Sequence, residues 1–479
     1  MPALIVVISL ALGTFVPTDT WIDWFHHPAR QPLPEATKAG ATLFRAMLFV
    51  LAAAWIIIPA LLERYIRPDE PFTFQRIGDA AHGPKVSQRF MMWSVVALII
   101  IGLLIRATRL TESLWYDEIS AFTQYAQHDP GVIIANYFDP ANHITHTLLT
   151  WCALELLSGD PLALRAPALL FSLLSIVFVF GLAREFLNDR IALIAAAWMA
   201  LSPVAVLEGA EARGYSMMIA LSALSTWLLL AGARHPRHTL WLGYGLITAI
   251  AIWAHPLTAF VPIGHALWIG WQAVRTRHWS LFMCGVFALA LSTITTLTLY
   301  APALPDMIAH ADSLQRTSAE QPSLLGPEGL HALLQVGGVW YWWAALPGLA
   351  CFIVGFITAA QSRTGRMMLA VTLLGGPVMA IVFSSANTWM YARFALFMLP
   401  GAALVSTFGL YALQQTSRSL FATALAIVLA GFAADLVVRP PKQPLRDAMN
   451  IVHSHHRPGE SVLIVGLAHH VMDIYVGNL

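Results

Sequence analysis

Long apolar stretches recur along the whole chain, and they constrain the fold more than any other feature. These windows are roughly 15 to 23 residues long, close to the ~20 residues that a helix needs to cross a bilayer. Their repetition excludes a soluble enzyme with one anchor, and their continuity excludes the alternating strands of an outer-membrane barrel. The composition agrees, with 58% hydrophobic and only 11% charged residues. The sequence therefore predicts an all-α polytopic membrane protein.

We expect about thirteen membrane helices. The apolar windows place them at 2–16, 43–62, 91–105, 166–183, 191–206, 215–232, 239–253, 257–273, 280–300, 338–359, 367–384, 392–413 and 419–438. The first window lacks a basic segment and a cleavage site, so we interpret it as a membrane helix rather than a signal peptide. Segment 144–157 contains Glu155 and is short for a full crossing. We expect it to be a broken or re-entrant helix.

Basic residues predict the orientation of these helices, because short cytoplasmic loops collect Lys and Arg. The basic loops are 63–90, 184–190, 232–238, 274–278 and 362–366. Alternation then places the remaining loops on the outer side, at 106–143, 207–214, 254–256, 301–337, 385–391 and from 439 onward. The formal net charge of +1 argues against nucleic acid as a partner. The three cysteines lie in apolar segments and predict neither a disulfide framework nor a metal site.

The first outer loop carries an acidic pair, Asp117 and Glu118, in the stretch LWYDEISA with Trp115 and Tyr116. One helical stripe of this loop consists of Leu114, Trp115, Ile119, Phe122 and Ala126, which predicts an interfacial helix with its aromatic side chains among the lipid headgroups. In one interpretation Asp117 caps this helix and Glu118 favours its first turn. In the other interpretation, a carboxylate of this pair is a general base. It takes a proton from a hydroxyl group of one substrate while the other substrate is dissolved in the lipid.

Two further outer elements carry arginines. EGAEARGYS contains Glu211, Arg213 and Tyr215, and YARFALFMLP contains Arg393 behind Tyr391. Each arginine could be an ordinary snorkelling anchor at a helix end. Together, on the same side as the acidic pair, they favour an anion site, because guanidinium groups suit phosphate oxygens.

Asn142, His143 and His255 also lie at outer boundaries. The histidines are either ordinary interfacial residues or neutral imidazoles that bind a metal, a sugar or a phosphate. No H-E-x-x-H or Cys-rich spacing predicts a dedicated zinc site.

In this order, LWYDEISA, NHITHTLL, EGAEARGYS, AHPLT and YARFALFMLP resemble the polytopic glycosyltransferases of the GT-C class. The pattern is most similar to the bacterial branch related to protein O-mannosyltransferases and the lipid A aminoarabinose transferase. The resemblance covers roughly 91–475. It implies a transmembrane catalytic domain at 86–438. Two extra membrane helices with a basic cytoplasmic loop at 1–85 lie outside the resemblance, and the outer tail at 439–479 is short. The tail pattern predicts a small α/β unit of one helix, a Pro-Gly turn and one buried strand.

The resemblance implies an inverting transferase in the bacterial cytoplasmic membrane, with its site facing the periplasm or exterior. Its expected partners are a polyprenyl-phosphate sugar donor and a hydroxyl acceptor on a protein, lipid or glycan. Asp117 resembles the catalytic acid with Glu118 as its neighbour, and Arg213, Tyr215 and Arg393 resemble the residues that bind the donor phosphate. The expected substrate-lining residues are Trp115, Tyr116, Asn142, His143, Glu211, His255 and Tyr391.

No cofactor is required by this interpretation, although Glu118, His143 or His255 could hold a divalent metal. The competing interpretations are a transporter or flippase, and a non-catalytic binding subunit, for lipid-linked sugars. Transporters tend to place their charges near the membrane midplane in two related halves. Here the charges gather at one interface and no repeat is visible.

Overall fold

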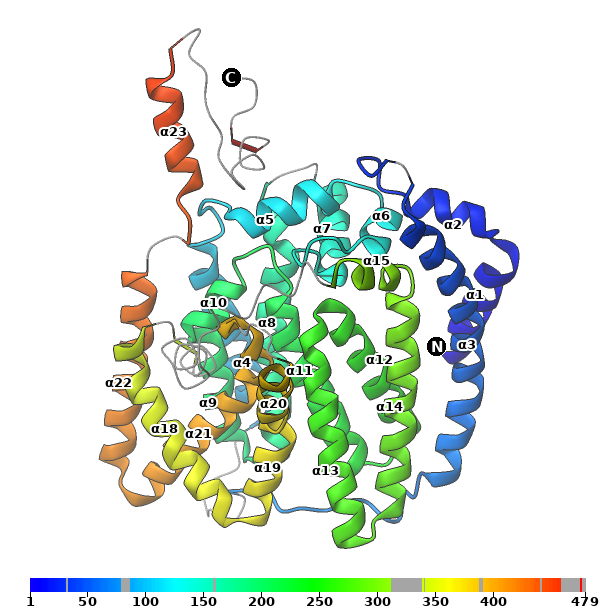
Figure 1. Cartoon of the computed structure of the whole chain (residues 1–479). Helices are drawn as coiled ribbons and strands as arrows, with labels where there is room; N and C mark the ends of the chain where they lie inside the picture. Colours follow the sequence, from blue (N-terminus) through cyan, green and yellow to red (C-terminus); the bar gives the residue numbers. More distant parts are fainter. Residues whose placement is uncertain are drawn as a thin grey trace.

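The computed structural model describes residues 1–31, 33–78, 87–157, 161–311, 338–339, 341–386, 391–439, 442–457 and 474–475. These residues form a bundle of helices (Figure 1). Within the described ranges the β pairing is limited to one isolated bridge between Ile77 and Leu187. The expected all-α polytopic architecture is therefore observed.

Nine helices of the described chain are long and apolar enough to cross a membrane. They are α3 (Glu35–Tyr65), α4 (Gln88–Ala107), α8 (Pro161–Phe186), α11 (Tyr215–Arg234), α13 (Phe260–Thr276) with the preceding 3₁₀ turn η2 (Pro256–Ala259), α14 (Trp279–Tyr300), α18 (Trp342–Gln361), α21 (Leu399–Thr416) with η4 (Ala392–Met398), and α22 (Arg418–Val438). Two bent pairs raise the number to eleven: α1 (Pro2–Phe15) with α2 (Thr18–Phe25), and α19 (Arg363–Leu373) with α20 (Gly375–Ser385). The predicted number of about thirteen is not confirmed.

The difference in number has a local cause in each case. The window 191–206 forms two helices, α9 (Asp189–Leu201) and α10 (Pro203–Glu208), because Pro203 cannot continue the helix before it and instead starts the next one. The window 239–253 forms α12 (His238–Ala254), which is apolar but short. The windows 2–16 and 367–384 fall in the two bent pairs, in which the helices turn by 99° and 42°, respectively. Apolar length alone did not show these breaks.

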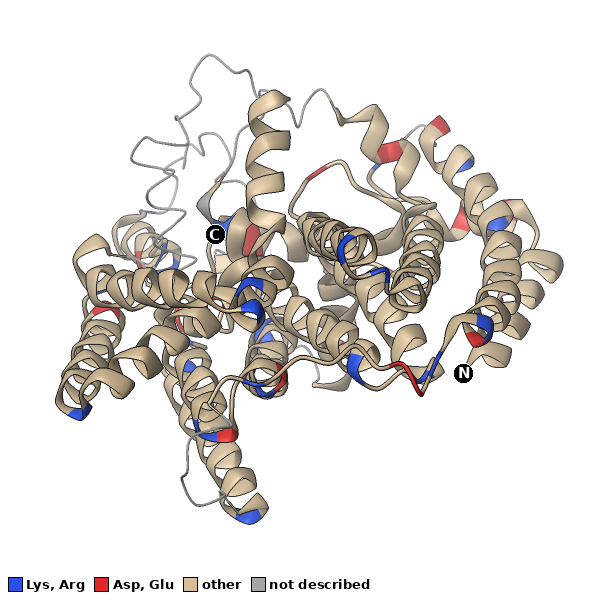
Figure 2. Ribbon diagram, turned by 90° about the horizontal axis from the view of Figure 1, so that it is seen from below, with Lys and Arg blue, Asp and Glu red and all other residues tan. Residues whose placement is uncertain are grey.

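The loops that were expected on the cytoplasmic side lie together at one end of the bundle. Segment 66–78 crosses this end, where the amide of Phe72 donates to the carbonyl of Ala233 at 3.0 Å and the amide of Ile77 donates to Phe186 at 2.7 Å. The hydroxyl of Thr364 donates to the carbonyl of Gln75 at 2.8 Å. Figure 2 views the bundle from this end and shows Lys and Arg on several of its helix ends and loops.

Short helices gather at the opposite end (Figure 1). They are α2, α5 (Tyr116–Ala121), the π-helical turn η1 (Phe122–Ala126), α6 (Pro130–Ala135), α7 (Ile144–Leu156) and α15 (Leu304–Ala309). The segment expected to be re-entrant is α7, which has 13 residues and is not among the candidate spans. In the tail, α23 (Leu445–His455) projects from this end, whereas the expected turn and strand lie outside the described residues.

Two helices form the centre of the bundle. In α11 and in the span from Arg393 to Thr416, 78% of the apolar window is buried, compared with 17% in α4 and α22. The central helices begin at Tyr215 and close to Arg393, respectively. The two expected phosphate-binding segments are therefore held by the most enclosed helices of the fold.

Candidate active site

The segment before Asp117 is shaped by Arg165, a buried residue of α8. Its guanidinium donates to the carbonyl groups of Leu110 at 2.9 Å and Glu112 at 3.0 Å, and it binds Glu118 through Nε at 2.9 Å and Nη2 at 2.8 Å. Such two-point pairing of Arg with a carboxylate fixes direction as well as distance. Arg165 thereby sets the path of the chain that enters α5.

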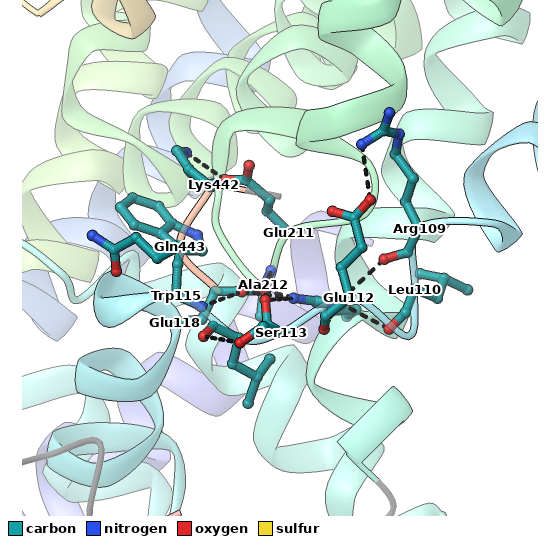
Figure 3. A network of polar contacts seen from close by, with 12 residues as sticks. Arg109, Leu110, Glu112, Ser113, Trp115, Glu118, Glu211, Ala212, Lys442 and Gln443 are labelled. Carbon is teal, nitrogen blue, oxygen red and sulfur yellow. Dashed lines mark hydrogen bonds and ion pairs between the residues drawn. The ribbon is translucent and has the colours of Figure 1, made fainter. Parts of the chain in front are cut away.

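Glu118 is enclosed by protein partners. It is 1% exposed, and besides Arg165 it accepts hydrogen bonds from the amides of Ala212 at 2.6 Å and Trp115 at 3.1 Å (Figure 3). The bond from Trp115 caps the first turn of α5. Capping, which the sequence assigned to Asp117 in one interpretation, is therefore performed by Glu118.

The apolar stripe of this segment faces the protein. Leu114 and Ile119 are buried in a cluster with Leu164 and Ala212, and Trp115 is 6% exposed. The expectation that these aromatic and apolar side chains lie among lipid headgroups is wrong. A stripe of period 3.6 marks a buried helix face whether lipid or protein covers it.

Asp117 points away from this buried face and meets both expected arginines. Its Oδ2 lies 3.5 Å from Nη2 of Arg213 and 3.4 Å from Nη2 of Arg393. The Asp117 side chain is 21% exposed, whereas that of Arg213 is 4% exposed. The Nε atoms of both arginines are buried and lack a hydrogen-bond partner among the described residues. One partly exposed carboxylate therefore contacts two guanidinium groups, each of which has an Nε atom without a hydrogen-bond partner among the described residues.

The histidines His143 and His255 stand behind Arg213. Their rings lie 4.7 Å apart, and each packs on Tyr215 at 5.0 to 5.2 Å. Nδ1 of His143 accepts from the amide of Gly214 at 2.7 Å, which leaves the proton of the neutral ring on Nε2. Burial, and then repulsion from Arg213, lowers the pKa of His143 well below its ordinary value and that of His255 to about 3. Both rings are therefore neutral near pH 7.

Asn142 and Tyr391 contact the segments and side chains next to these arginines and histidines. The side-chain amide of Asn142 donates to the carbonyl groups of Ile133 and Asn136 at 2.9 and 2.8 Å, which fixes the loop that leads to His143. The ring of Tyr391 lies 5.1 Å from the guanidinium carbon of Arg393.

The indole of Trp115 lies among three cations. The guanidinium carbons of Arg393 and Arg213 lie 5.5 and 5.9 Å from its ring centroid, and Nζ of Lys442 lies 3.7 Å from it. Lys442 also pairs with Glu211 at 2.7 Å (Figure 3). Next to it, the side chain of Gln443 accepts from the amide of Tyr116 at 2.9 Å. The segment after α22 is thus part of the site.

The possible metal ligands do not converge. Both oxygens of Glu118 accept from protein donors, and Nε2 of His143 carries the ring proton and lies 3.4 Å from Nη2 of the cation Arg213. Across the described part of the chain, no group of three His, Cys, Asp or Glu side chains could hold a metal ion. In this arrangement Glu118, His143 and His255 do not form a common site for a divalent cation.

Sequence reasoning missed Arg165, Lys442 and the enclosed position of Glu118. Arg165 had a usable signal, because a charge in an otherwise apolar helix needs a partner. Lys442 lies in the stretch RPPKQP, which has no helical or strand period that could place it.

Residues 143–317 match the family model described as dolichyl-phosphate-mannose-protein mannosyltransferase. This part includes His143, Arg213 and His255, whereas Asp117 and Arg393 lie outside it. Among curated proteins no match is found.

Solved structures extend the comparison to most of the chain. ArnT from Cupriavidus metallidurans bound to undecaprenyl phosphate is 17% identical, with 72% of this chain and 64% of that chain covered at a TM-score of 0.51. The apo state of ArnT is 16% identical, with 71% and 63% covered at a TM-score of 0.50. The Archaeoglobus fulgidus oligosaccharyltransferase tethered with an acceptor peptide is 14% identical, with 78% and 58% covered at a TM-score of 0.49.

This chain matches 58 to 64% of the length of those proteins, and the likeness to ArnT concerns the fold. The family match over residues 143–317 and the helical fold shared with ArnT confirm the resemblance to the polytopic GT-C glycosyltransferases that the sequence motifs indicated.

Proposed function

We propose that this protein is an inverting glycosyltransferase that moves a sugar from a polyprenyl-phosphate-linked donor to a hydroxyl acceptor at the outer face of a bacterial cytoplasmic membrane. The observation that carries the proposal is the contact of Asp117 Oδ2 with both Arg213 and Arg393. It joins a group that can accept a proton to two groups that can bind a phosphate. The undecaprenyl phosphate bound to ArnT, which has a similar fold, supports a lipid phosphate as the carrier of the transferred sugar and the leaving group of the reaction.

The reaction is a single displacement. Asp117 takes the proton of the acceptor hydroxyl, whose oxygen forms a bond to the anomeric carbon of the sugar. The bond between that carbon and the phosphate oxygen breaks, and its electron pair stays on the phosphate. One base suffices for this route, because no covalent sugar intermediate forms.

The two arginines suit this reaction because the total negative charge on Asp117 and the phosphate is the same before and after transfer. Before transfer, Asp117 and the phosphodiester each carry one negative charge. After transfer, Asp117 is neutral and the lipid phosphomonoester carries the additional charge. Arg213 and Arg393 therefore serve both states without a change in their own charge. Fixed charges placed at a developing anion are among the largest catalytic contributions.

Glu118 acts in this proposal as a positioning residue, because its oxygens are occupied by Arg165 and two backbone amides. His143 presents its Nε2–H toward the arginines, where it can donate to the phosphate or the sugar. No step needs a metal ion. Tyr215 and Tyr391 orient the guanidinium groups through their ring faces.

The distribution of basic loops supports the proposed orientation. The site lies at the end of the bundle opposite to segment 66–78 and the other basic loops, which we assign to the cytoplasm. The lipid-linked donor would then be used from the periplasmic or exterior leaflet, and the acceptor could be a hydroxyl group of a protein, a lipid or a glycan.

The proposal is tested by transfer of labelled sugar from polyprenyl-phosphate sugars in proteoliposomes, with Asp117→Asn as the variant. The wild type should release label from the donor, whereas Asp117→Asn should bind the donor and transfer at least about a hundredfold more slowly. A wild-type protein that binds donor without consuming it, or moves it intact across the bilayer, would contradict the proposal and identify a binding or transport role.

A further inference from the structure

Glu208 is a buried carboxyl group at the site that the proposed reaction does not use. It ends α10, is 8% exposed, and its Oε2 has no hydrogen-bond partner among the described residues. Native proteins satisfy nearly all buried polar atoms, so this oxygen is available to accept from a water or a ligand. Burial, and then the neighbouring Glu211, raises the pKa of Glu208 to about 7. Near neutral pH the group is therefore present both as an acid and as a carboxylate.

Glu211 lies three residues after Glu208 in the chain and pairs with Lys442, and we treat the three residues as one cluster. Nζ of Lys442 lies 2.7 Å from Oε2 of Glu211, and the lysine side chain is 27% exposed. Both of these residues act electrostatically on Glu208. Figure 3 shows Lys442 reaching Glu211 on the side of Trp115. The cluster thus combines buried carboxyl groups with a partly accessible amine.

The cluster lies beside the reacting groups. Lys442 rests on the indole of Trp115, and the same ring has Arg213 and Arg393 within 5.9 Å. Asp117 follows Trp115 by two positions in α5. A sugar whose anomeric carbon lies at Asp117 therefore has its other ring positions within reach of the groups around Trp115.

The charge of the cluster selects the chemistry of its ligand. The cluster combines two carboxyl groups with Lys442 and the nearby charge of Arg439, so it has no net charge that would favour a phosphate, which Arg213 and Arg393 already attract. An ammonium group would meet Lys442, and also Arg439, whose charge acts on both glutamates. Neutral hydroxyl groups fit, because Lys442 donates, a carboxylate accepts, and protonated Glu208 can donate as well.

We propose that Glu208, Glu211 and Lys442 form the subsite that binds the hydroxyl groups of the transferred sugar. The subsite selects a neutral, hydroxylated sugar over one that carries a charged amino group. This inference rests on the proposed function and names the class of its substrate.

Binding measurements test the subsite separately from catalysis. The probes are polyprenyl-phosphate mannose, polyprenyl-phosphate glucosamine and polyprenyl phosphate without a sugar, each with wild type, Glu208→Gln and Lys442→Met in detergent. The matched control is Glu155→Gln, which neutralises an exposed carboxylate of α7.

Glu208→Gln and Lys442→Met should weaken binding of the mannosyl donor by about 10- to 100-fold and leave the sugar-free lipid within about twofold. Lys442→Met should also shift the preference toward the glucosamine donor, because Glu211 then lacks its cation. Lys442→Arg, which keeps the charge, should retain the wild-type preference. Glu155→Gln should match the wild type for all three lipids.

Equal loss of affinity for the mannosyl donor and the sugar-free lipid would overturn the subsite, because the cluster would then bind phosphate or only hold the fold. Equal wild-type affinity for the mannose and glucosamine donors would overturn it as well. A wild type that discriminates between these lipids but transfers no sugar would support the subsite and overturn the proposed function.

Discussion

Arg393 Nη2 lies 3.4 Å from Asp117 Oδ2, although one residue precedes the central helix α21 and the other lies in the first outer loop. Arg213 approaches the same oxygen at 3.5 Å from a third segment. The contact shows that the proposed base and the proposed phosphate site are one unit. A change in Arg213 or Arg393 should therefore alter both donor binding and transfer, whereas Asp117→Asn should retain donor binding and lose transfer.

Two replacements of Arg393 should show how much its positive charge and its planar donor geometry each contribute to transfer. Arg393→Ala should lower kcat/KM for transfer by about 100- to 1,000-fold, which is typical for loss of one group that stabilises a developing anion. Arg393→Lys should fall between this variant and the wild type, because lysine keeps the charge but lacks the planar fork. Steady-state transfer and binding of sugar-free polyprenyl phosphate measure the effect. Unchanged lipid affinity in Arg393→Ala would contradict the assigned role.

The pair of Glu118 and Arg165 should be critical for stability. Both side chains are at most 3% exposed, so Arg165→Met leaves a buried carboxylate without its cation and should cost about 3–5 kcal/mol. Glu118→Gln should be similarly damaging. The double variant should lose less than the sum of the two, because neither charge then remains unpaired. Thermal unfolding in detergent gives these values, and additive losses would show that the two residues do not act together.

The buried histidines should make the protein sensitive to acid. In the unfolded chain His255 titrates near 6.5, whereas burial lowers its pKa to about 3 in the folded protein. As the pH falls below about 6.5, the unfolded chain gains protons that the folded one does not bind. Stability that is present above this pH should be lost steadily toward pH 3, the folded pKa of His255.

His255→Asn should reduce the dependence of the free energy of unfolding on pH by about 1.4 kcal/mol per pH unit. The measurement is the difference in melting temperature between variant and wild type from pH 7.5 to 4.5. A difference that stays constant over this range would show that His255 titrates normally. Glu208, whose pKa is raised, contributes in the opposite direction in both proteins and cancels in the difference.

The extra amino-terminal helices should brace the site end of the bundle. Arg30 pairs with the buried carboxylate of Asp306 at 2.9 Å and donates to Asn136 at 3.1 Å, and Asp306 accepts from the amide of Tyr137 at 2.7 Å. These contacts join the segment after α2 to α6 and α15.

Arg30→Met should destabilise the fold by about 2–3 kcal/mol, since it leaves Asp306 buried without this cation. Lys38→Met is the matched control, because its pair with Glu35 is exposed and should contribute less than about 1 kcal/mol. Equal melting temperatures for the two variants would indicate that the amino-terminal helices are not part of the same cooperative unit.

Sequence patterns predicted the membrane class and the gathering of outer loops, because charges at the ends of apolar windows are visible in one dimension. Asp117, Arg213 and Arg393 were found in this way, and the structure brings them together. The same patterns could not count the spans, since Pro203 and the bend between α19 and α20 interrupt windows that look continuous.

The environment of the first outer loop was also beyond the sequence. The stripe of Leu114 and Ile119 has the same period whether it faces lipid or Leu164, so its burial depends on tertiary packing. The pairing of Glu118 with Arg165 likewise depends on tertiary structure, because the two residues are far apart in the sequence. Lys442 reaches Trp115 from a proline-rich segment whose course no local rule determines.

The late position of Lys442 in the chain has a consequence for biogenesis. Asp117 emerges from the ribosome before Arg213, which precedes α11, and before Arg393, which starts a later span. Lys442, which packs on the neighbouring Trp115, follows only after α22. During synthesis the nascent protein therefore holds an exposed acid without its partners. The site becomes complete only when α22 and the segment after it have been synthesised, so chains that stop before Lys442 should lack the assembled site.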